Sequence, residues 1–152
     1  MVSMREDDNR PTEEPQQGQR LPCRRILVAD DENAIRSLMS AVLLHAGYHV
    51  DAAQDGAVAW AALQAGPYDL LITDCDMPKV TGIELVKNLR SAHMDLPVIL
   101  VTGALPWHEL TDSSLQIAAT LEKPFTIPNL LDVVGNVLRA AASPHEPIPV
   151  ES

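Results

Sequence analysis

Residues 70–78 read LLITDCDMP, an apolar run that stops abruptly at Asp74. Three further runs have the same form: ILVADDE at 26–32, PVILVTG at 97–103 and the weaker IAATLEKP at 117–124. Short apolar runs without polar alternation are typical of strands in a parallel sheet that helices cover on both faces. The four runs therefore predict buried parallel strands.

Between these runs the spacing of apolar residues changes to that of helices. Strands are expected at residues 26–29, 48–53, 70–73, 98–101 and 117–121, and helices at 33–46, 56–65, 83–89, 106–114 and 127–142. Gly47 is expected to end the first helix from the position after its C-cap. Five alternations of strand and helix predict an α/β fold, a flavodoxin-like (βα)5 doubly wound parallel sheet with strand order 2-1-3-4-5.

The runs end in residues that suit phosphoryl-transfer chemistry. Ligands of such sheets bind beyond the carboxyl ends of the strands, at the crevice where the winding reverses. The first and third strands flank this crevice. The residues expected at that edge are Asp30, Asp31, Asp74, Thr102 and Lys123.

Three carboxylates in one small cleft repel each other, and a divalent cation such as Mg²⁺ would relieve this repulsion. Asp74 could then attack phosphorus and form an aspartyl phosphate. Lys123 could pair with one phosphoryl oxygen, and Thr102 could donate a hydrogen bond to another.

Each of these residues also has a simpler interpretation when it is taken singly. Asp31, Glu32 and Asn33 could cap the first helix. Thr102 before Gly103, and Lys123 before Pro124, could belong to ordinary turns. Independent turns and caps explain poorly why all five predicted site residues follow strands in the appropriate order.

The stretches ILVADDE, LLITDCDMPKVTGIEL, PVILVTG and EKPF resemble the response-regulator receiver domains of bacterial two-component signalling, in particular those that stand alone. The resemblance implies that Asp74 is the phosphoacceptor and that Asp30 and Asp31 hold Mg²⁺ or Mn²⁺ together with Asp74. It also implies the following roles: the backbone carbonyl of Asp76 as a further metal ligand, Thr102 and Lys123 as phosphoryl contacts, a cis Lys123-Pro124 bond, and Pro78 and Gly82 in the loop after the third strand.

One position departs from the family pattern. Receivers usually carry Tyr or Phe three residues before the lysine, where the ring rotates as a switch, but this chain has Thr120. Coupling to an output face would then use other residues. Trp107, in the predicted fourth helix, could supply the aromatic surface.

Composition and charge bear on domains and partners. Of 152 residues, 46% are hydrophobic but only five are aromatic, so the core must be mainly aliphatic. Residues 1–22 and 143–152 lack apolar periodicity, so we expect a disordered N-terminal tail, a receiver domain at 23–142 and a short C-terminal tail. The net charge of −10 argues against direct nucleic-acid binding.

The first residues, MVSMREDDNR, have no apolar region typical of a signal peptide, and no apolar stretch of the sequence approaches the length of a membrane span. A cytoplasmic protein is therefore expected. Cys23 and Cys75 fall at opposite edges of the predicted sheet, too far apart for a disulfide. With no output domain visible, the receiver is expected to act through an unidentified protein target. A sensor histidine kinase or a histidine phosphotransfer protein is the expected donor, and the oligomeric state is left open.

Two other functions remain open on the sequence. A haloacid-dehalogenase-type phosphohydrolase would use Asp74 and Asp76 as nucleophile and acid/base, but its nucleophile strand comes first and its late acids follow the lysine. A receiver-like docking module would work without phosphorylation. The favoured hypothesis is a signalling protein with no enzymatic activity beyond Mg²⁺-dependent autophosphotransfer and autodephosphorylation.

Overall fold

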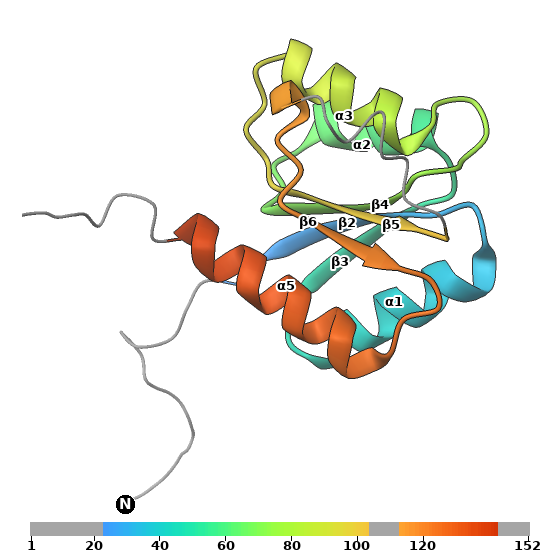
Figure 1. Ribbon diagram of the computed structural model, residues 1–152, viewed down its shortest axis with the longest axis vertical. Coiled ribbons are helices and arrows are strands. Elements are labelled where there is room, and N and C mark those ends of the chain that lie inside the picture. Colours follow the sequence, from blue (N-terminus) through green and yellow to red (C-terminus); the bar gives the residue numbers. More distant parts are fainter. Residues whose placement is uncertain (1–22, 104–112, 143–152) are drawn as a thin grey trace, which may run out of the picture.

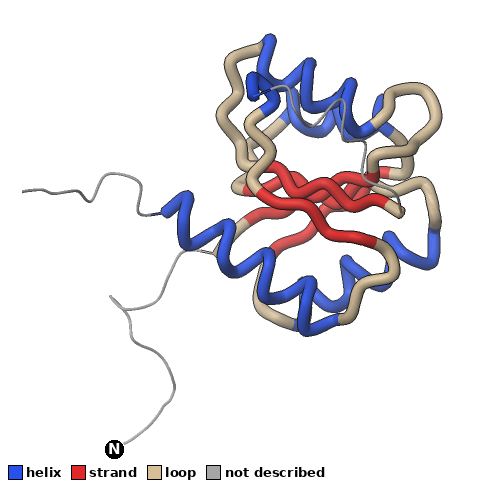
Figure 2. Tube along the Cα trace, viewed as in Figure 1, coloured by secondary structure: helices blue, strands red, loops and turns tan. Residues whose placement is uncertain are grey.

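A five-stranded parallel sheet forms the centre of the computed structural model, which describes residues 23–103 and 113–142 (Figures 1 and 2). Its strands are β2 (Arg25–Ala29), β3 (His49–Ala53), β4 (Leu70–Asp74), β5 (Val98–Thr102) and β6 (Ala119–Glu122). They lie in the order β3-β2-β4-β5-β6, and all four neighbouring pairs are parallel. In chain order this is 2-1-3-4-5, so the predicted topology is confirmed.

Helices cover both faces of the sheet. They are α1 (Asn33–His45), α2 (Gly56–Ala65), α3 (Gly82–Ser91) and α5 (Ile127–Ala142), and a short 3₁₀ turn, η2, spans Ser113–Leu115. Figure 1 shows α1 and α5 on one face and α2 and α3 on the other. Each face has its own apolar cluster, one including Met39 and Val134 and the other including Leu63 and Leu85.

The central strands have no solvent-facing side. All five residues of β4 and all five of β5 are buried, which explains why their sequences are apolar without alternation. The edge strands β3 and β6 are partly exposed and carry the polar positions. The interior is mostly Leu, Ile, Val and Ala, as the shortage of aromatic residues predicted.

Local chemistry explains where the helices begin and end. Asp55 caps α2 by accepting a hydrogen bond from the Val58 N–H, and Thr81 and Glu84 form a reciprocal capping box at α3. Gly47 follows the α1 C-cap with φ of 104°, a left-handed conformation that favours glycine, as predicted.

The last strand differs most from its predicted position. It begins at Ala119 rather than residue 117, because Gln116 adopts a left-handed backbone (φ 53°). Ile117 packs against the apolar cluster under α2 and α3, which includes Leu63 and Leu85. The strand then continues through Glu122, so Lys123 follows it directly.

Some predictions fall on parts of the chain that the structure does not describe. These are both predicted tails and the segment 104–112, which contains residues 106–112 of the predicted helix 106–114. The last two positions of that helix, 113 and 114, begin η2. Across residues 23–103 and 113–142, no helix combines the length and apolarity that a bilayer span requires. Cys23 and Cys75 are not joined to each other by a disulfide.

Candidate functional site

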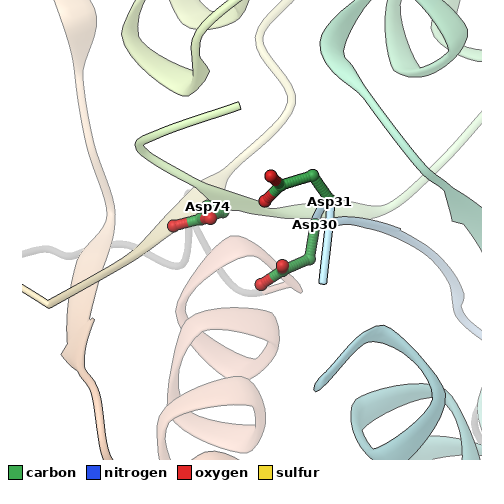
Figure 3. Close-up of side chains that lie close together, drawn as sticks. All are labelled: Asp30, Asp31 and Asp74. Carbon is green, nitrogen blue, oxygen red and sulfur yellow. The ribbon is translucent and has the colours of Figure 1, made fainter. Parts of the chain in front are cut away.

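Three aspartates meet at the carboxyl edge of the sheet. Asp74 is the last residue of β4, and Asp30 and Asp31 follow β2, its parallel neighbour. One carboxylate oxygen of each lies within 4.8 Å of the others, and Figure 3 shows the three side chains gathered at this edge. Asp30 and Asp74 are buried, whereas Asp31 is exposed. The predicted acidic cluster therefore exists in the fold.

Lys123 places one cation against this cluster. Its Nζ lies 3.3 Å from Asp30 Oδ2 and 3.5 Å from Asp74 Oδ2. The same Nζ donates a hydrogen bond to Glu32 Oε1, 3.1 Å away. One ammonium thus contacts three carboxylates, with a fourth, that of Asp31, close by.

Burial and crowding perturb the ionisation of the central pair. Burial, reinforced by the charge of Asp30, raises the pKa of Asp74 to about 6, although Lys123 acts in the opposite direction. Burial alone would lower the pKa of Lys123, but the hydrogen bond to Glu32 and the charges of Asp30 and Asp74 together raise it. The site therefore carries excess negative charge that one lysine does not neutralise.

The donor set fits a hard divalent cation. Asp30 Oδ1 accepts a hydrogen bond from the Glu32 N–H at 2.8 Å, but its buried Oδ2 has no hydrogen-bond partner among the described residues. Mg²⁺ prefers oxygen ligands, carboxylates among them, and an oxygen without a hydrogen bond has a lone pair to offer. The residues present are therefore chemically suited to the predicted metal.

Thr102 and Lys123 lie side by side at the ends of neighbouring strands. Thr102 is the last residue of β5, fully buried, and pairs in register with Glu122 of β6. The Lys123-Pro124 peptide bond is cis, as the family resemblance implied.

The loop after β4 packs tightly against the site. Gly82 was predicted to lie in this loop but is the first residue of α3, directly after the N-cap Thr81. A Cβ on Gly82 would lie 2.1 Å from the Asp74 carbonyl oxygen, so only glycine allows this approach. Lys79, with φ of 72°, forms an ion pair with the buried Asp55 at 3.5 Å. Asp76, whose carbonyl was predicted to ligate metal, lies in this loop with its side chain exposed.

Two contacts at the site were not predicted. Glu32 is the N-cap residue of α1, but its side chain makes no capping hydrogen bond and contacts Lys123 instead. The Asp55–Lys79 pair joins α2 to the β4–α3 loop. The acidic triplet of residues 30–32 was the only sequence signal for the first, and nothing in the sequence indicated the second.

The two residues predicted for output are placed differently. Thr120 is exposed on the edge strand β6, opposite Leu100 of β5. Trp107 lies outside the described residues.

A model of the response regulator receiver domain matches residues 26–135. The chain belongs to this family. Receiver domains are signalling modules of two-component systems that accept phosphoryl groups from histidine kinases and act on downstream targets. One such domain covers most of the chain.

Relatives of this receiver differ in overall length. It is 37% identical over 119 residues to the response regulator receiver protein CpdR of Brucella abortus, covering 78% of this chain and 99% of that protein. It is 35% identical over 114 residues to the DNA-binding transcriptional regulator NtrC of Rhizobium meliloti, covering 74% of this chain but only 24% of the regulator.

Solved receivers share the fold. The chemotaxis response regulator CheY4 of Vibrio cholerae superposes with a TM-score of 0.70 at 33% identity, over 76% of this chain and 99% of that one. A CheY-like receiver domain protein from Methanospirillum hungatei superposes with a TM-score of 0.76 over 80% of this chain and 98% of that one. Its identity is 24%, so this second likeness concerns the fold alone.

Proposed function

We propose that this receiver is phosphorylated on Asp74 by a histidine-phosphorylated partner. The observation that carries the proposal is the position of the Asp74 carboxylate, within 4.8 Å of two acidic neighbours and 3.5 Å from Lys123 Nζ. An oxygen of Asp74 would form the new bond to phosphorus as the P–N bond to the donor histidine breaks. The released imidazole nitrogen takes up a proton, and an aspartyl phosphate remains.

Asp30, Asp31 and Asp74, with the backbone carbonyl of Asp76, are the groups we expect to hold Mg²⁺ or Mn²⁺. Such a cation supplies positive charge that offsets the charge of the transferred phosphoryl group. The buried Oδ2 of Asp30 supports this assignment, because within the described residues it has an ion-pair contact with Lys123 but no hydrogen bond.

Two side chains are proposed to contact the phosphoryl group directly. Lys123 already lies beside the Asp74 oxygens, so its ammonium can pair with a phosphoryl oxygen without a large displacement. Thr102 ends the adjacent strand and could donate its hydroxyl hydrogen to another oxygen.

The signal is proposed to pass through the surface near β6 and α5. Since Thr120 has no ring to rotate, the change would be carried by the residues that follow Thr102, including Trp107. We infer that a protein target reads this change. Donors would be a sensor histidine kinase or a histidine phosphotransfer protein, with the reaction taking place in the cytoplasm.

The phosphohydrolase alternative agrees poorly with the fold. Its nucleophile would end the first strand, whereas Asp74 ends the third strand in chain order. We therefore propose no enzymatic activity beyond autophosphotransfer and autodephosphorylation.

Intact-mass measurement tests the proposed function. With acetyl phosphate and Mg²⁺, the wild-type chain should gain one phosphoryl group and Asp74→Asn should gain none. Equal labelling of both proteins would overturn the assignment. No labelling of either would favour the docking module, and turnover of a generic phosphate ester would favour the phosphohydrolase.

A further inference from the structure

Lys123 is held at the rim of the site by a residue outside the acidic cluster. Of its three carboxylate contacts, the hydrogen bond to Glu32 is the shortest, at 3.1 Å against 3.3 Å to Asp30 and 3.5 Å to Asp74. Glu32 and Lys123 are 91 residues apart in the chain, so this contact joins the start of α1 to the end of β6.

The Glu32 side chain has no other task in the described structure. It occupies the N-cap position of α1, yet it makes no side-chain capping hydrogen bond. Its own N–H is already satisfied by Asp30 Oδ1. The carboxylate therefore contributes to the site chiefly through the lysine.

We propose that Glu32 restrains Lys123 in the unphosphorylated state and competes with the phosphoryl group for its ammonium. This inference rests on the proposed function. A lysine ammonium has three N–H donors, and three carboxylates surround this one. A phosphoryl group on Asp74 brings further anionic oxygens to the same ammonium, so Glu32 and those oxygens must share it.

Of the three contacts of Lys123, the one with Glu32 should be the weakest and should break most easily. The Glu32 side chain is 59% exposed, whereas that of Asp30 is 0% and that of Asp74 is 8% exposed. Exposed ion pairs are screened by water and contribute little. The restraint is therefore one that phosphorylation can overcome, and its removal should strengthen phosphoryl binding modestly.

Beryllofluoride, a small mimic of the phosphoryl group, measures this competition. Titration calorimetry at saturating Mg²⁺ should show that Glu32→Gln binds beryllofluoride about 1.5- to 5-fold more tightly than wild type, the range expected for loss of an exposed ion pair. Asp132→Asn, which removes an exposed α5 carboxyl, controls for net charge and should bind as wild type does.

Glu32→Asp separates the contact from the charge, because it keeps the carboxylate but shortens its reach by one methylene. It should also bind more tightly than wild type. In a Lys123→Met background, Glu32→Gln should have no effect, since no ammonium remains to be released.

Three results would each overturn the restraint. The first two are a beryllofluoride affinity equal to that of wild type in Glu32→Gln or in Glu32→Asp. The third is an undiminished effect of Glu32→Gln on that affinity in the Lys123→Met background. Failure of the proposed function looks different. In that case no protein, wild type included, binds beryllofluoride or takes up acetyl phosphate.

Discussion

The backbone N–H of Lys123 donates a hydrogen bond to the carbonyl oxygen of Thr102, with an N···O distance of 2.8 Å. This bond extends the pairing of β5 and β6 one residue beyond the last register pair, Thr102 and Glu122. The backbones of the two proposed phosphoryl contacts are therefore joined by a direct hydrogen bond.

Stability should depend on pH through Asp74. Its pKa is raised from 3.8 to about 6, so the folded state holds the proton more tightly than the unfolded state does. The stability contributed by the protonated group is fully present below about pH 4 and is lost as the pH rises through about 6.

Asp74→Asn cannot ionise, so its stability relative to wild type should increase by on the order of 2–3 kcal/mol between pH 4 and pH 7.5. Denaturant unfolding in EDTA at both pH values measures this. Asp132→Asn serves as the control for charge removal. A relative stability of Asp74→Asn that is independent of pH would contradict the raised pKa.

Removal of Asp31 should have opposite effects with and without metal. In EDTA, Asp31→Ala should be at least as stable as wild type, because one source of repulsion is gone. With millimolar Mg²⁺, wild type should gain several degrees in Tm and the variant almost nothing, because binding to the folded state is what stabilises. Thermal melts decide this, and an equal Mg²⁺ shift in both proteins would remove Asp31 from the metal site.

Gly82 should tolerate no side chain. The Cβ of Gly82→Ala would lie 2.1 Å from the Asp74 carbonyl oxygen, so the β4–α3 loop must move, at a cost of about 3 kcal/mol. Acetyl phosphate labelling should slow as well, since the loop sets the surroundings of Asp74. Gly103→Ala is a matched control because its Cβ would meet no atom of the described residues within 4 Å. Equal stability of the two variants in urea would refute the expectation.

Arg90 should be a major stabilising residue far from the chemistry. Its guanidinium donates to four backbone carbonyls, those of Met94, Leu96, Leu115 and Gln116, at 2.7–3.1 Å. It thereby ties the end of α3 to the segment that precedes β6. Arg90→Met leaves these carbonyls without the donor and should cost about 2–4 kcal/mol.

Hydrogen exchange provides a second measure of the Arg90 contacts. Amides of residues 113–118 should exchange faster in Arg90→Met. The exposed Lys87→Met, on the same helix, should change neither stability nor exchange. Wild-type stability in Arg90→Met would show that the four hydrogen bonds contribute nothing net.

Activation should alter the fluorescence of Trp107 but not that of Trp60. Trp107 lies five residues after Thr102 in the sequence, whereas Trp60 packs on the α2–α3 face of the core. A Trp60→Phe variant isolates the Trp107 signal, and beryllofluoride with Mg²⁺ supplies the trigger. If emission and the amide shifts of residues 103–122 stay constant at saturation, the partner reads only the active-site face.

The sequence was sufficient to predict the fold and the grouping of the three aspartates. Runs such as LLIT and VILV are apolar at consecutive positions because both faces of β4 and β5 are covered, a property that local sequence reports directly. Once the strands are parallel and ordered, their carboxyl ends must meet at one edge. That is why the sequence alone groups Asp30, Asp31 and Asp74.

The partners of the charged side chains, in contrast, follow from tertiary packing. Lys123 contacts Glu32, which the sequence suggested merely as a helix cap. Asp55, at the start of α2, pairs with Lys79 in the loop between β4 and α3. The start of β6 at Ala119 likewise depends on the left-handed turn at Gln116. Apolar periodicity depends on which face of an element is buried, so it can be recognised within a short stretch of sequence. The choice among several carboxylates within reach of one flexible lysine depends on ångström-scale distances between distant segments, which only packing determines.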